Sequence, residues 1–341
     1  MGSVKDLAVI EKPSGEKEGI GEFIFSDRYS VFDWGEMPNH IENKGKALCI
    51  IGAYFFEKLE EMGIATHYIG VVENNRVKRI DELNEASNVM RIKLLRVLKP
   101  EKIGEAYDYA IYKKERGNFL IPLEIIYRNF LPAGSSVFKR LKNGDLKLED
   151  IWLKEMPFPG QKLEEPILDV STKLESIDRY ITWEEARDIA GLNEEEIREM
   201  KEITMAINKL INREVEKAGL INEDGKIEYG FDINRKMIVV DVFGTPDECR
   251  FTFNGMPLSK EIARIFYRNT EWYKKVQEAK KKDRIRWKEM VPPPPPLPPR
   301  LVELISMLYQ ACCNEITQTQ FFEVPSIGSI AEQIGEIIEN P

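Results

Sequence analysis

Short runs of β-branched and aliphatic residues are interspersed irregularly with stretches of helical spacing along this chain of 341 residues. Residues 88–98 and 119–127 are typical of buried strands, whereas residues 46–62 place apolar side chains at the period of a helix. The strands and helices do not follow a strict alternating rhythm, and no internal repeat of solenoid period is present. The pattern therefore predicts an α+β fold with a cleft, in a chain long enough for one large or two modest cores.

Local patterns also predict two hairpins and a pair of capped helices. Residues 8–28 and residues 219–244 each contain two strand-like runs joined by a turn. Residues 182–217 carry long helical patterns, and Thr182 and Asn193 are candidate N-caps because their side-chain oxygens can accept from free backbone amides.

The C-terminal part combines a basic helix with a proline tract. Residues 259–282 are expected to form one helix that becomes basic towards its end. Residues 292–299, interrupted by Leu297, must adopt the extended polyproline II conformation. We expect this tract to act as a stiff spacer rather than as a ligand for an SH3-like partner. An amphipathic helix over residues 301–316 is expected next, with Cys312 and Cys313 packed in the core.

Composition excludes several classes of protein. The net charge of −9 disfavours the broad basic surface of a nucleic-acid or anionic-membrane binder. No apolar run approaches the roughly 18 residues that a membrane span needs, and the N-terminus lacks a secretory pattern, so a cytoplasmic location is expected. Four scattered cysteines are expected to be reduced thiols, and two histidines are too few for a histidine-based metal cage.

The hairpin around residue 235 carries the most informative candidate site. If Asn234 and Arg235 form a two-residue turn, Glu228 and Asp241 face each other across the strands. Two facing carboxylates repel unless a cation or a raised pKa relieves them, and Mg²⁺ bound with nucleotide phosphates would do so. Lys226 shares the face of Glu228, because alternate residues of a strand point the same way. The alternative is two unrelated surface acids.

Three other segments place cations near glycine or turn residues. Arg128 precedes the Gly-Ser-Ser run of residues 134–136, which suits an anion site or, alternatively, an ordinary loop. Residues 245–250 form a turn directly after the acidic strand. Lys260 and Arg264 stand four apart, so both can clamp one phosphate or form surface salt bridges.

Several segments between residues 2 and 265, taken in chain order, together resemble the SAICAR synthetase family. The resemblance rests on Gly2–Leu7, Ser26–Asp33, Ile41–Gly45, Leu120–Arg128 with Ala133–Ser135, Ser171–Glu175, Asp224–Gly230, and Asp247 with Arg250. It implies an ATP-grasp-like α+β fold with two lobes around an ATP cleft. The implied parts are an N-terminal lobe (1–119), a second lobe with the metal and substrate site (120–265) and a C-terminal helical extension (266–341).

The resemblance also implies a reaction of purine biosynthesis. ATP phosphorylates the carboxylate of the ribotide CAIR, and the amine of L-aspartate attacks the acyl phosphate to give SAICAR, ADP and phosphate. ATP and Mg²⁺ are the implied cofactors, and CAIR and L-aspartate are the implied substrates. The enzyme would be a phosphoribosylaminoimidazole-succinocarboxamide synthase, an ATP-dependent ligase that forms a C–N bond.

The same resemblance implies roles for individual residues of this sequence. The implied ATP-binding residues are Val4, Lys5, Lys226, Glu228 and Asp241, of which Glu228 and Asp241 hold the metal. The implied substrate-binding residues are Asp33, Arg128, Ser135, Arg250, Lys260 and Arg264. The implied catalytic residues are Lys226, Asp247 and Arg250.

The sequence departs from the family pattern at several positions. Ser3 stands where the family usually has lysine, Val242 where glutamate is common, and Cys249 where serine is common. Two alternatives therefore stay open: a related ligase for a different carboxylate and amine, or a non-catalytic nucleotide-binding scaffold that acts through its proline tract. A homodimer is expected only from base rates.

Overall fold

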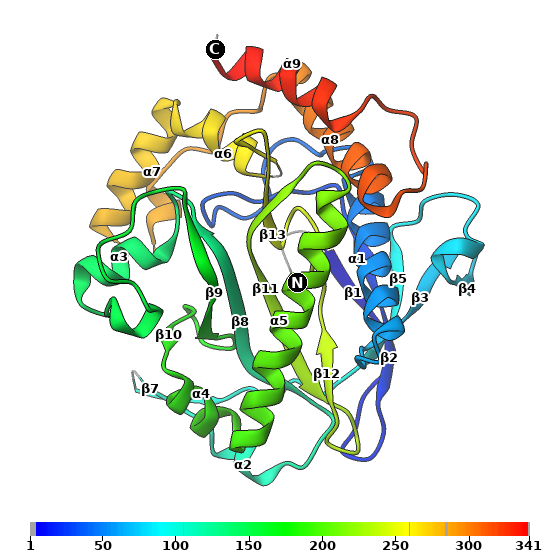
Figure 1. The fold of residues 1–341 in the computed structure, drawn as a ribbon, viewed down its shortest axis with the longest axis vertical. Helices are drawn as coiled ribbons and strands as arrows, with labels where there is room; N and C mark the ends of the chain where they lie inside the picture. Colours follow the sequence, from blue (N-terminus) through cyan, green and yellow to red (C-terminus); the bar gives the residue numbers. More distant parts are fainter. Residues whose placement is uncertain (1–4, 105, 259, 284–285, 340–341) are drawn as a thin grey trace.

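A computed structural model describes residues 5–104, 106–258, 260–283 and 286–339, and it confirms the expected α+β fold (Figure 1). The first sheet is antiparallel and comes from the N-terminal third of the chain. In spatial order its strands are β1 (Lys5–Glu11), β2 (Gly19–Phe25), β5 (Val89–Leu94), β3 (Tyr68–Glu73) and β4 (Arg76–Lys78). The predicted N-terminal hairpin is thus confirmed as β1 and β2.

The second sheet is larger, also antiparallel, and carries most of the residues discussed below. Its path runs through β10 (Tyr180–Ile181), β9 (Gln161–Thr172), β8 (Phe119–Leu131), β11 (Ile221–Phe231), β13 (Cys249–Phe253) and β14 (Met256–Pro257), and β12 (Met237–Val240) pairs with β11. A separate ribbon consists of β6 (Glu101–Ile103) and β7 (Ala106–Asp108).

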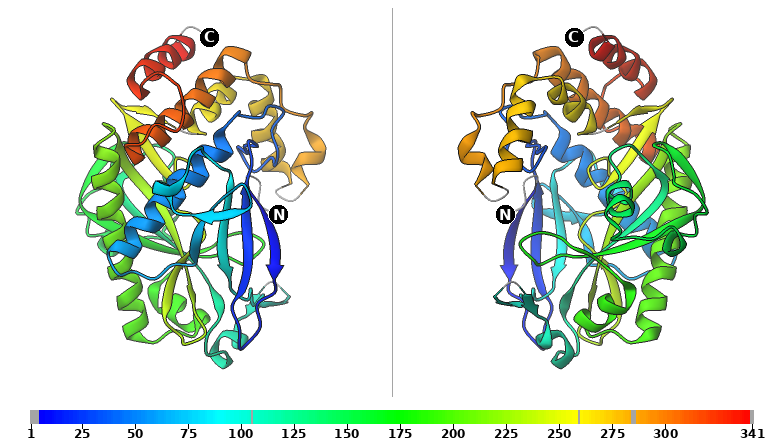
Figure 2. Two further views of the ribbon diagram at one scale, coloured as in Figure 1. Left: turned by 90° about the vertical axis from the view of Figure 1, so that its right-hand side faces the viewer. Right: turned by 90° about the vertical axis from the view of Figure 1, so that its left-hand side faces the viewer.

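Helices cover both sheets, and the last part of the described chain, from residue 261 onwards, contains helices and no strands. They are α1 (Lys44–Glu61), α2 (Ala110–Lys114), α3 (Ser136–Asn143), α4 (Trp183–Ala190), α5 (Glu194–Glu216), α6 (Glu261–Arg268), α7 (Glu271–Lys282), α8 (Pro299–Thr317) and α9 (Ile327–Glu339), with short 3₁₀ turns at 80–82, 149–151 and 287–290. Helix α5 packs on β8 and β11, and α1 contacts both the first sheet and α8. Helices α8 and α9 lie together at one end of the molecule, and the β1–β2 turn lies towards the other (Figures 1 and 2).

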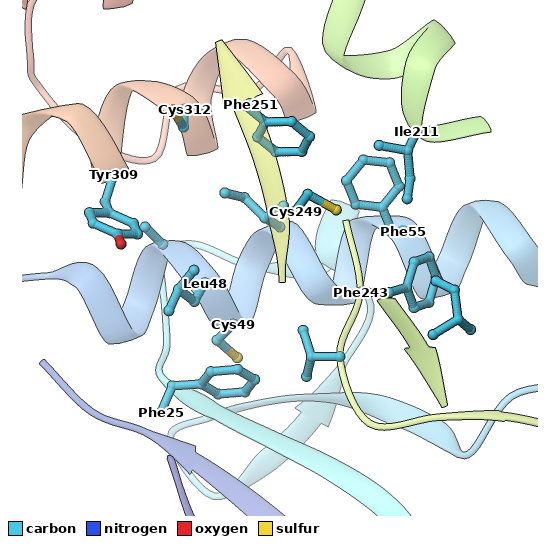
Figure 3. Close-up of a cluster of buried hydrophobic side chains, with 14 of the residues drawn as sticks. Phe25, Leu48, Cys49, Phe55, Ile211, Phe243, Cys249, Phe251, Tyr309 and Cys312 are labelled. Carbon is cyan, nitrogen blue, oxygen red and sulfur yellow. The ribbon is translucent and has the colours of Figure 1, made fainter. Parts of the chain in front are cut away.

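One continuous core joins the two sheets through α1. Figure 3 shows Leu48, Cys49 and Phe55 of α1 among side chains from β2 (Phe25), α5 (Ile211), β13 (Phe251) and α8 (Tyr309, Cys312). Parallel bridges at Thr66–Val239 and Arg96–Phe119 connect the sheets directly. The strands of the first sheet all precede residue 95 and those of the second all follow residue 118. The proposed division into lobes at residues 119 and 265 stays a prediction.

The helix caps follow the expected chemistry. The Thr182 hydroxyl accepts from the Glu185 amide at 3.1 Å, and the Asn193 side chain accepts from the Glu196 amide at 2.9 Å. The prediction of one helix over residues 259–282 is wrong, because Thr270 starts a second helix: its hydroxyl accepts from the Tyr273 amide at 3.3 Å.

The proline tract packs as an extended spacer that leads into α8. Every third residue, Val291, Pro294 and Leu297, is buried, as the threefold period of polyproline II requires for one inward face. Trp272 Nε1 donates to the Pro292 carbonyl at 2.9 Å. Helix α8 confirms the expected C-terminal helix, and both of its cysteines are buried. Within the described residues, no helix is long and apolar enough to cross a membrane.

Candidate active site

A cleft of about 1220 Å³ opens between the second sheet and helices α6 and α7. Strands β8, β11 and β13 supply polar side chains to it from the sheet, and α6 supplies cations from the other side. The predicted site residues that line it are Asp33, Arg128, Lys226, Asp247, Arg250, Lys260 and Arg264. A large cleft with converging charged groups is the expected place for a reaction on small polar substrates.

Lysines and carboxylates alternate in a cluster that borders this cleft: Glu124 and Lys226 line it, and Lys173 and Glu228 stand behind them. Glu124 on β8 and Glu228 on β11 are register partners, and Lys226 lies two residues from Glu228 on the same face. Lys226 Nζ lies 3.1 Å from Glu124 Oε1 and 3.0 Å from Glu228 Oε1. Lys173, directly after β9, adds a second ammonium 2.5 Å from Glu228 Oε1. The predicted shared face of Lys226 and Glu228 is therefore confirmed.

The predicted register of the β11–β12 hairpin is wrong. Glu228 pairs with Val240, not with Asp241, so the turn does not have two residues. The turn spans Asp232 to Lys236, an odd number of residues, because the Asp232 carboxylate accepts from the Asn234 and Lys236 amides at 2.8 Å each. This side-chain bonding closes a longer turn than the sequence suggested.

Asp241 nevertheless reaches the same cluster by another route. Its backbone is left-handed, with φ of 59°, and the carbonyl contacts His67 Nε2 at 3.1 Å. The strand ends there, and the carboxylate forms an ion pair with Lys5. Lys5 thus joins Lys173 and Lys226 around the two acids.

The two acids of this cluster have opposite pKa shifts. Burial, reinforced by the Asp241 charge, raises the pKa of Glu228 to about 7. Burial also favours the neutral form of Asp241, but Lys5, Lys226 and Lys173 outweigh it and hold the pKa of Asp241 far below its usual range. Asp241 is therefore held as an anion, and Glu228 is the acid of the pair that takes up a proton more readily.

A buried arginine organises the next part of the cleft wall. Arg128 is 1% exposed, and its guanidinium donates to Asp169 Oδ2 at 3.0 Å and to Asp224 Oδ2 at 3.2 Å. Asp224 in turn binds Arg250 through two hydrogen bonds of 2.7 and 2.6 Å. Arg140 holds Asp169 at 2.9 Å. The structure therefore places Arg128 behind Arg250, with most of its donors already bonded.

Of the remaining predicted ligands, Asp33 and Arg264 line the cleft and Ser135 does not. The Ser135 side chain caps α3 by accepting from the Val137 amide at 3.4 Å, and the residue is buried. Arg264 lies on α6, one helical turn after Lys260, and pairs with Glu261 at 2.9 Å. Asp33 is well exposed and pairs with Lys280 at 2.9 Å. Val4 lies outside the described residues.

Several charged residues of the site had no assigned role in the sequence. Lys44, Lys173, Asp169, Asp224 and Glu248 all touch predicted site residues through ion pairs. Lys44, Lys173 and Asp224 stand inside segments that resemble the family, which is the only pattern that could have marked them. The spacing of residues along the chain does not show that such distant charged residues form ion pairs with the predicted site residues.

Comparison with known proteins decides the family. A family model described as SAICAR synthetase matches residues 14–286 of the chain. The chain belongs to the SAICAR synthetase family. It is 54% identical over 339 residues to an Archaeoglobus fulgidus protein with the provisional name phosphoribosylaminoimidazole-succinocarboxamide synthase, covering 99% of this chain and 100% of that protein. A phosphoribosylaminoimidazole-succinocarboxamide synthase of Thermoplasma acidophilum is 36% identical, covering 86% and 92%.

Solved structures of SAICAR synthetases share the fold. A SAICAR synthase from Saccharomyces cerevisiae, complexed with SAICAR, has a TM-score of 0.62 at 21% identity and covers 95% of each chain. A SAICAR synthetase in complex with ADP has a TM-score of 0.56 at 24% identity, covering 86% of this chain and 98% of that one. The predicted family, fold and enzyme class, a ligase of purine biosynthesis, are confirmed by these comparisons.

Proposed function

We propose that the cleft joins the carboxylate of CAIR to the amine of L-aspartate at the expense of ATP, through an acyl phosphate. The observation that carries the proposal is the arrangement of cations along one cleft. Lys226 lines the cleft together with Arg250, Lys260 and Arg264, and Lys5 and Lys173 stand beside it on the acid pair, outside the cleft lining. These two groups of cations suit two anionic substrates, a nucleoside triphosphate and a ribotide.

The lysine cluster is the proposed nucleotide end. Lys226 contacts three carboxylates, Glu124, Glu228 and Glu248, and one of these contacts can be exchanged for a phosphate oxygen. Lys5 joins Lys226 in this role, and Val4 stays a predicted ligand. The complex of a related SAICAR synthetase with ADP supports nucleotide use in this fold.

The acid pair fits a divalent cation. Glu228 and Asp241 supply carboxylate oxygens from two neighbouring segments, and Mg²⁺ is usually held by one or two carboxylates plus substrate phosphates. Within the described residues no group of three or more His, Cys, Asp or Glu side chains is suited to a metal, so phosphates and water would complete its coordination. When bound, Mg²⁺ would neutralise charge on the phosphates.

The arginine cluster is the proposed ribotide end. Arg250, Lys260 and Arg264 line the cleft and suit a sugar phosphate, since guanidinium groups bind phosphate through paired hydrogen bonds. Arg128 would act behind them by holding Asp224, and so Arg250, in place. Ser135, Asp33 and Asp247 stay predicted substrate or catalytic residues.

The chemistry asks for charge neutralisation and alignment more than for proton transfer. A carboxylate oxygen of the ribotide attacks the γ-phosphorus, and ADP leaves. The aspartate amine then attacks the acyl carbon, and inorganic phosphate leaves with one oxygen of the original carboxylate. Lys226 would neutralise the transferred phosphoryl group, and the arginine cluster would hold the carboxylate in line.

Four further expectations belong to this proposal. We retain the lobes 1–119 and 120–265 with the extension 266–341 as the units that enclose the cleft. The homodimer is a prediction that light scattering of the purified protein tests directly. The cytoplasmic location and the absence of nucleic-acid partners also stay predictions.

The test is release of ADP by the purified protein, with each component omitted in turn. We expect release only when ATP, Mg²⁺, L-aspartate and CAIR are all present, and no release when any one is absent. Turnover with another carboxylic acid but not with CAIR would support the divergent ligase. Nucleotide binding without turnover on any acid would support the scaffold.

A further inference from the structure

A buried ion cluster connects the C-terminal helix to the cleft. Asp247 lies in the turn between β12 and β13, and its side chain is 3% exposed. Lys44, the first residue of α1, has no exposed side-chain surface and places Nζ 2.8 Å from Asp247 Oδ2. Tyr309 of α8 donates its hydroxyl to Asp247 Oδ1 at 2.7 Å. Asp247 Oδ1 thus accepts a hydrogen bond, whereas Oδ2 has only the charge contact with Lys44 and, within the described residues, no hydrogen bond.

Helix α8 also holds the turn from which Lys44 comes. Ser306 Oγ donates to the Glu42 carbonyl at 2.7 Å, and Asn43 Nδ2 donates to Gln310 Oε1 at 3.4 Å. Positions 306, 309 and 310 share a helical face, since residues three and four apart lie above one another. Asn43 is left-handed, with φ of 59°, and leads directly into α1. One face of α8 therefore contacts both sides of the buried ion pair.

The turn that carries Asp247 also carries a cleft arginine. The Glu248 and Cys249 amides both donate to the Thr245 carbonyl, at 3.1 and 2.9 Å, and Arg250 follows at the start of β13. Asp247, Glu248 and Arg250 all line the cleft. The Tyr309 hydroxyl gives Asp247 the one hydrogen bond that this carboxylate has within the described residues, so losing it leaves both buried oxygens without a hydrogen bond, which is costly and should let the turn move.

We propose that Tyr309 is a positioning residue of the active site, which fixes Asp247 and so holds the turn that presents Arg250 to the cleft. The C-terminal helix is then part of the catalytic architecture, although none of its residues resembles the family's site motifs. The kinetic part of this proposal rests on the proposed ligase function, whereas its structural part does not.

Tyr309→Phe keeps the ring and removes the hydroxyl. We expect kcat/KM for CAIR to fall about tenfold, the usual range for losing one hydrogen bond to a charged group, with an unchanged KM for ATP. The matched control is Tyr267→Phe, which removes a hydroxyl that donates to the Pro295 carbonyl at 2.8 Å and contacts the Tyr29 hydroxyl at 3.2 Å, but is not the donor to Asp247. It should leave kcat/KM within about twofold.

Two further measurements separate positioning from general loss of stability. In an Asp247→Leu background, which leaves no oxygen to accept from the Tyr309 hydroxyl, Tyr309→Phe should change hydrogen exchange at the Glu248 and Cys249 amides by less than about twofold, since coupled residues are not additive. In substrate-free protein, the Glu248 and Cys249 amides should exchange hydrogen faster in Tyr309→Phe than in Tyr267→Phe, at a temperature where both are folded.

Equal exchange at these amides in wild type and Tyr309→Phe would overturn the proposal, as would an undiminished effect of Tyr309→Phe in the Asp247→Leu background. If the wild-type protein makes no product, the ligase function fails. The exchange measurement still decides whether Tyr309 holds the turn.

Discussion

At the scale of single residues, Lys226 has the largest predicted effect on the reaction. Lys226→Met keeps the length of the side chain and removes the ammonium that contacts Glu124, Glu228 and Glu248. Because this charge would stabilise the transferred phosphoryl group, we expect kcat to fall about 10²–10³-fold. Steady-state ADP release measures it. Lys142→Met, on the exposed side of α3, is the matched control and should behave as wild type. A Lys226→Met enzyme within threefold of wild type would remove Lys226 from the mechanism.

His67 predicts how stability depends on pH. Burial lowers the pKa of His67 to about 4 from its usual 6.5, and the ring contacts the Asp241 carbonyl at 3.1 Å. The unfolded chain therefore binds a proton between pH 6.5 and 4 that the folded chain does not. The contribution of His67 to the free energy of unfolding is therefore complete above pH 6.5. This free energy falls by about 3 kcal/mol as the pH drops to 4.

The measurement is urea unfolding at pH 7, 5.5 and 4.5 for wild type and His67→Gln. The glutamine can still donate to the Asp241 carbonyl but does not titrate, so its loss of stability over this range should be smaller than that of wild type. Parallel losses in the two proteins would show that His67 is not the group responsible.

Residue-level predictions from the sequence succeeded where chemistry is local. Lys226 and Glu228 share a face because strand geometry alone decides it. The predicted pairing of Glu228 with Asp241 was wrong because the Asp232 carboxylate bonds two amides and lengthens the turn, and Asp241 joins the cluster through its left-handed backbone instead. Both are particular conformations that composition does not reveal.

At the scale of elements, the conformation of the proline tract follows from its sequence, whereas its buried face is determined by tertiary packing. The sequence requires an extended tract but does not say which face is buried. Tyr267 and Trp272 decide it, by donating to the Pro295 and Pro292 carbonyls at 2.8 and 2.9 Å. The break between α6 and α7 has a similar origin: a helical pattern continues through Thr270, but its hydroxyl caps the second helix.

Packing of the tract predicts a stability effect. Leu297 is 2% exposed, so Leu297→Ala should destabilise the protein by about 2–4 kcal/mol through lost burial and a cavity. Pro296→Ala, on the exposed side of the same tract, should cost less than about 1 kcal/mol. Urea unfolding of both variants provides the comparison. Equal costs would mean that the tract is not held by its inward face.

At the scale of the whole molecule, the fold brings the site together from segments that are distant in the chain. The sequence predicted the α+β class and the main strands and helices, because their periodicities are local. It did not predict that β8, β9 and β11 place Glu124, Lys173 and Glu228 in one cluster, or that α8 reaches Asp247. Those contacts depend on strand order and helix packing, which the family resemblance implied only for the fold.

The central claim is that ATP activates the ribotide carboxylate in this cleft. Its most direct test is a reaction with CAIR carrying ¹⁸O in both carboxylate oxygens, followed by mass spectrometry of the released phosphate and of the product. We expect phosphate to acquire one ¹⁸O atom for each SAICAR formed and SAICAR to keep the other. Unlabelled phosphate formed at the same rate as ADP would contradict the acyl phosphate, because the carboxylate oxygen would then not have attacked ATP.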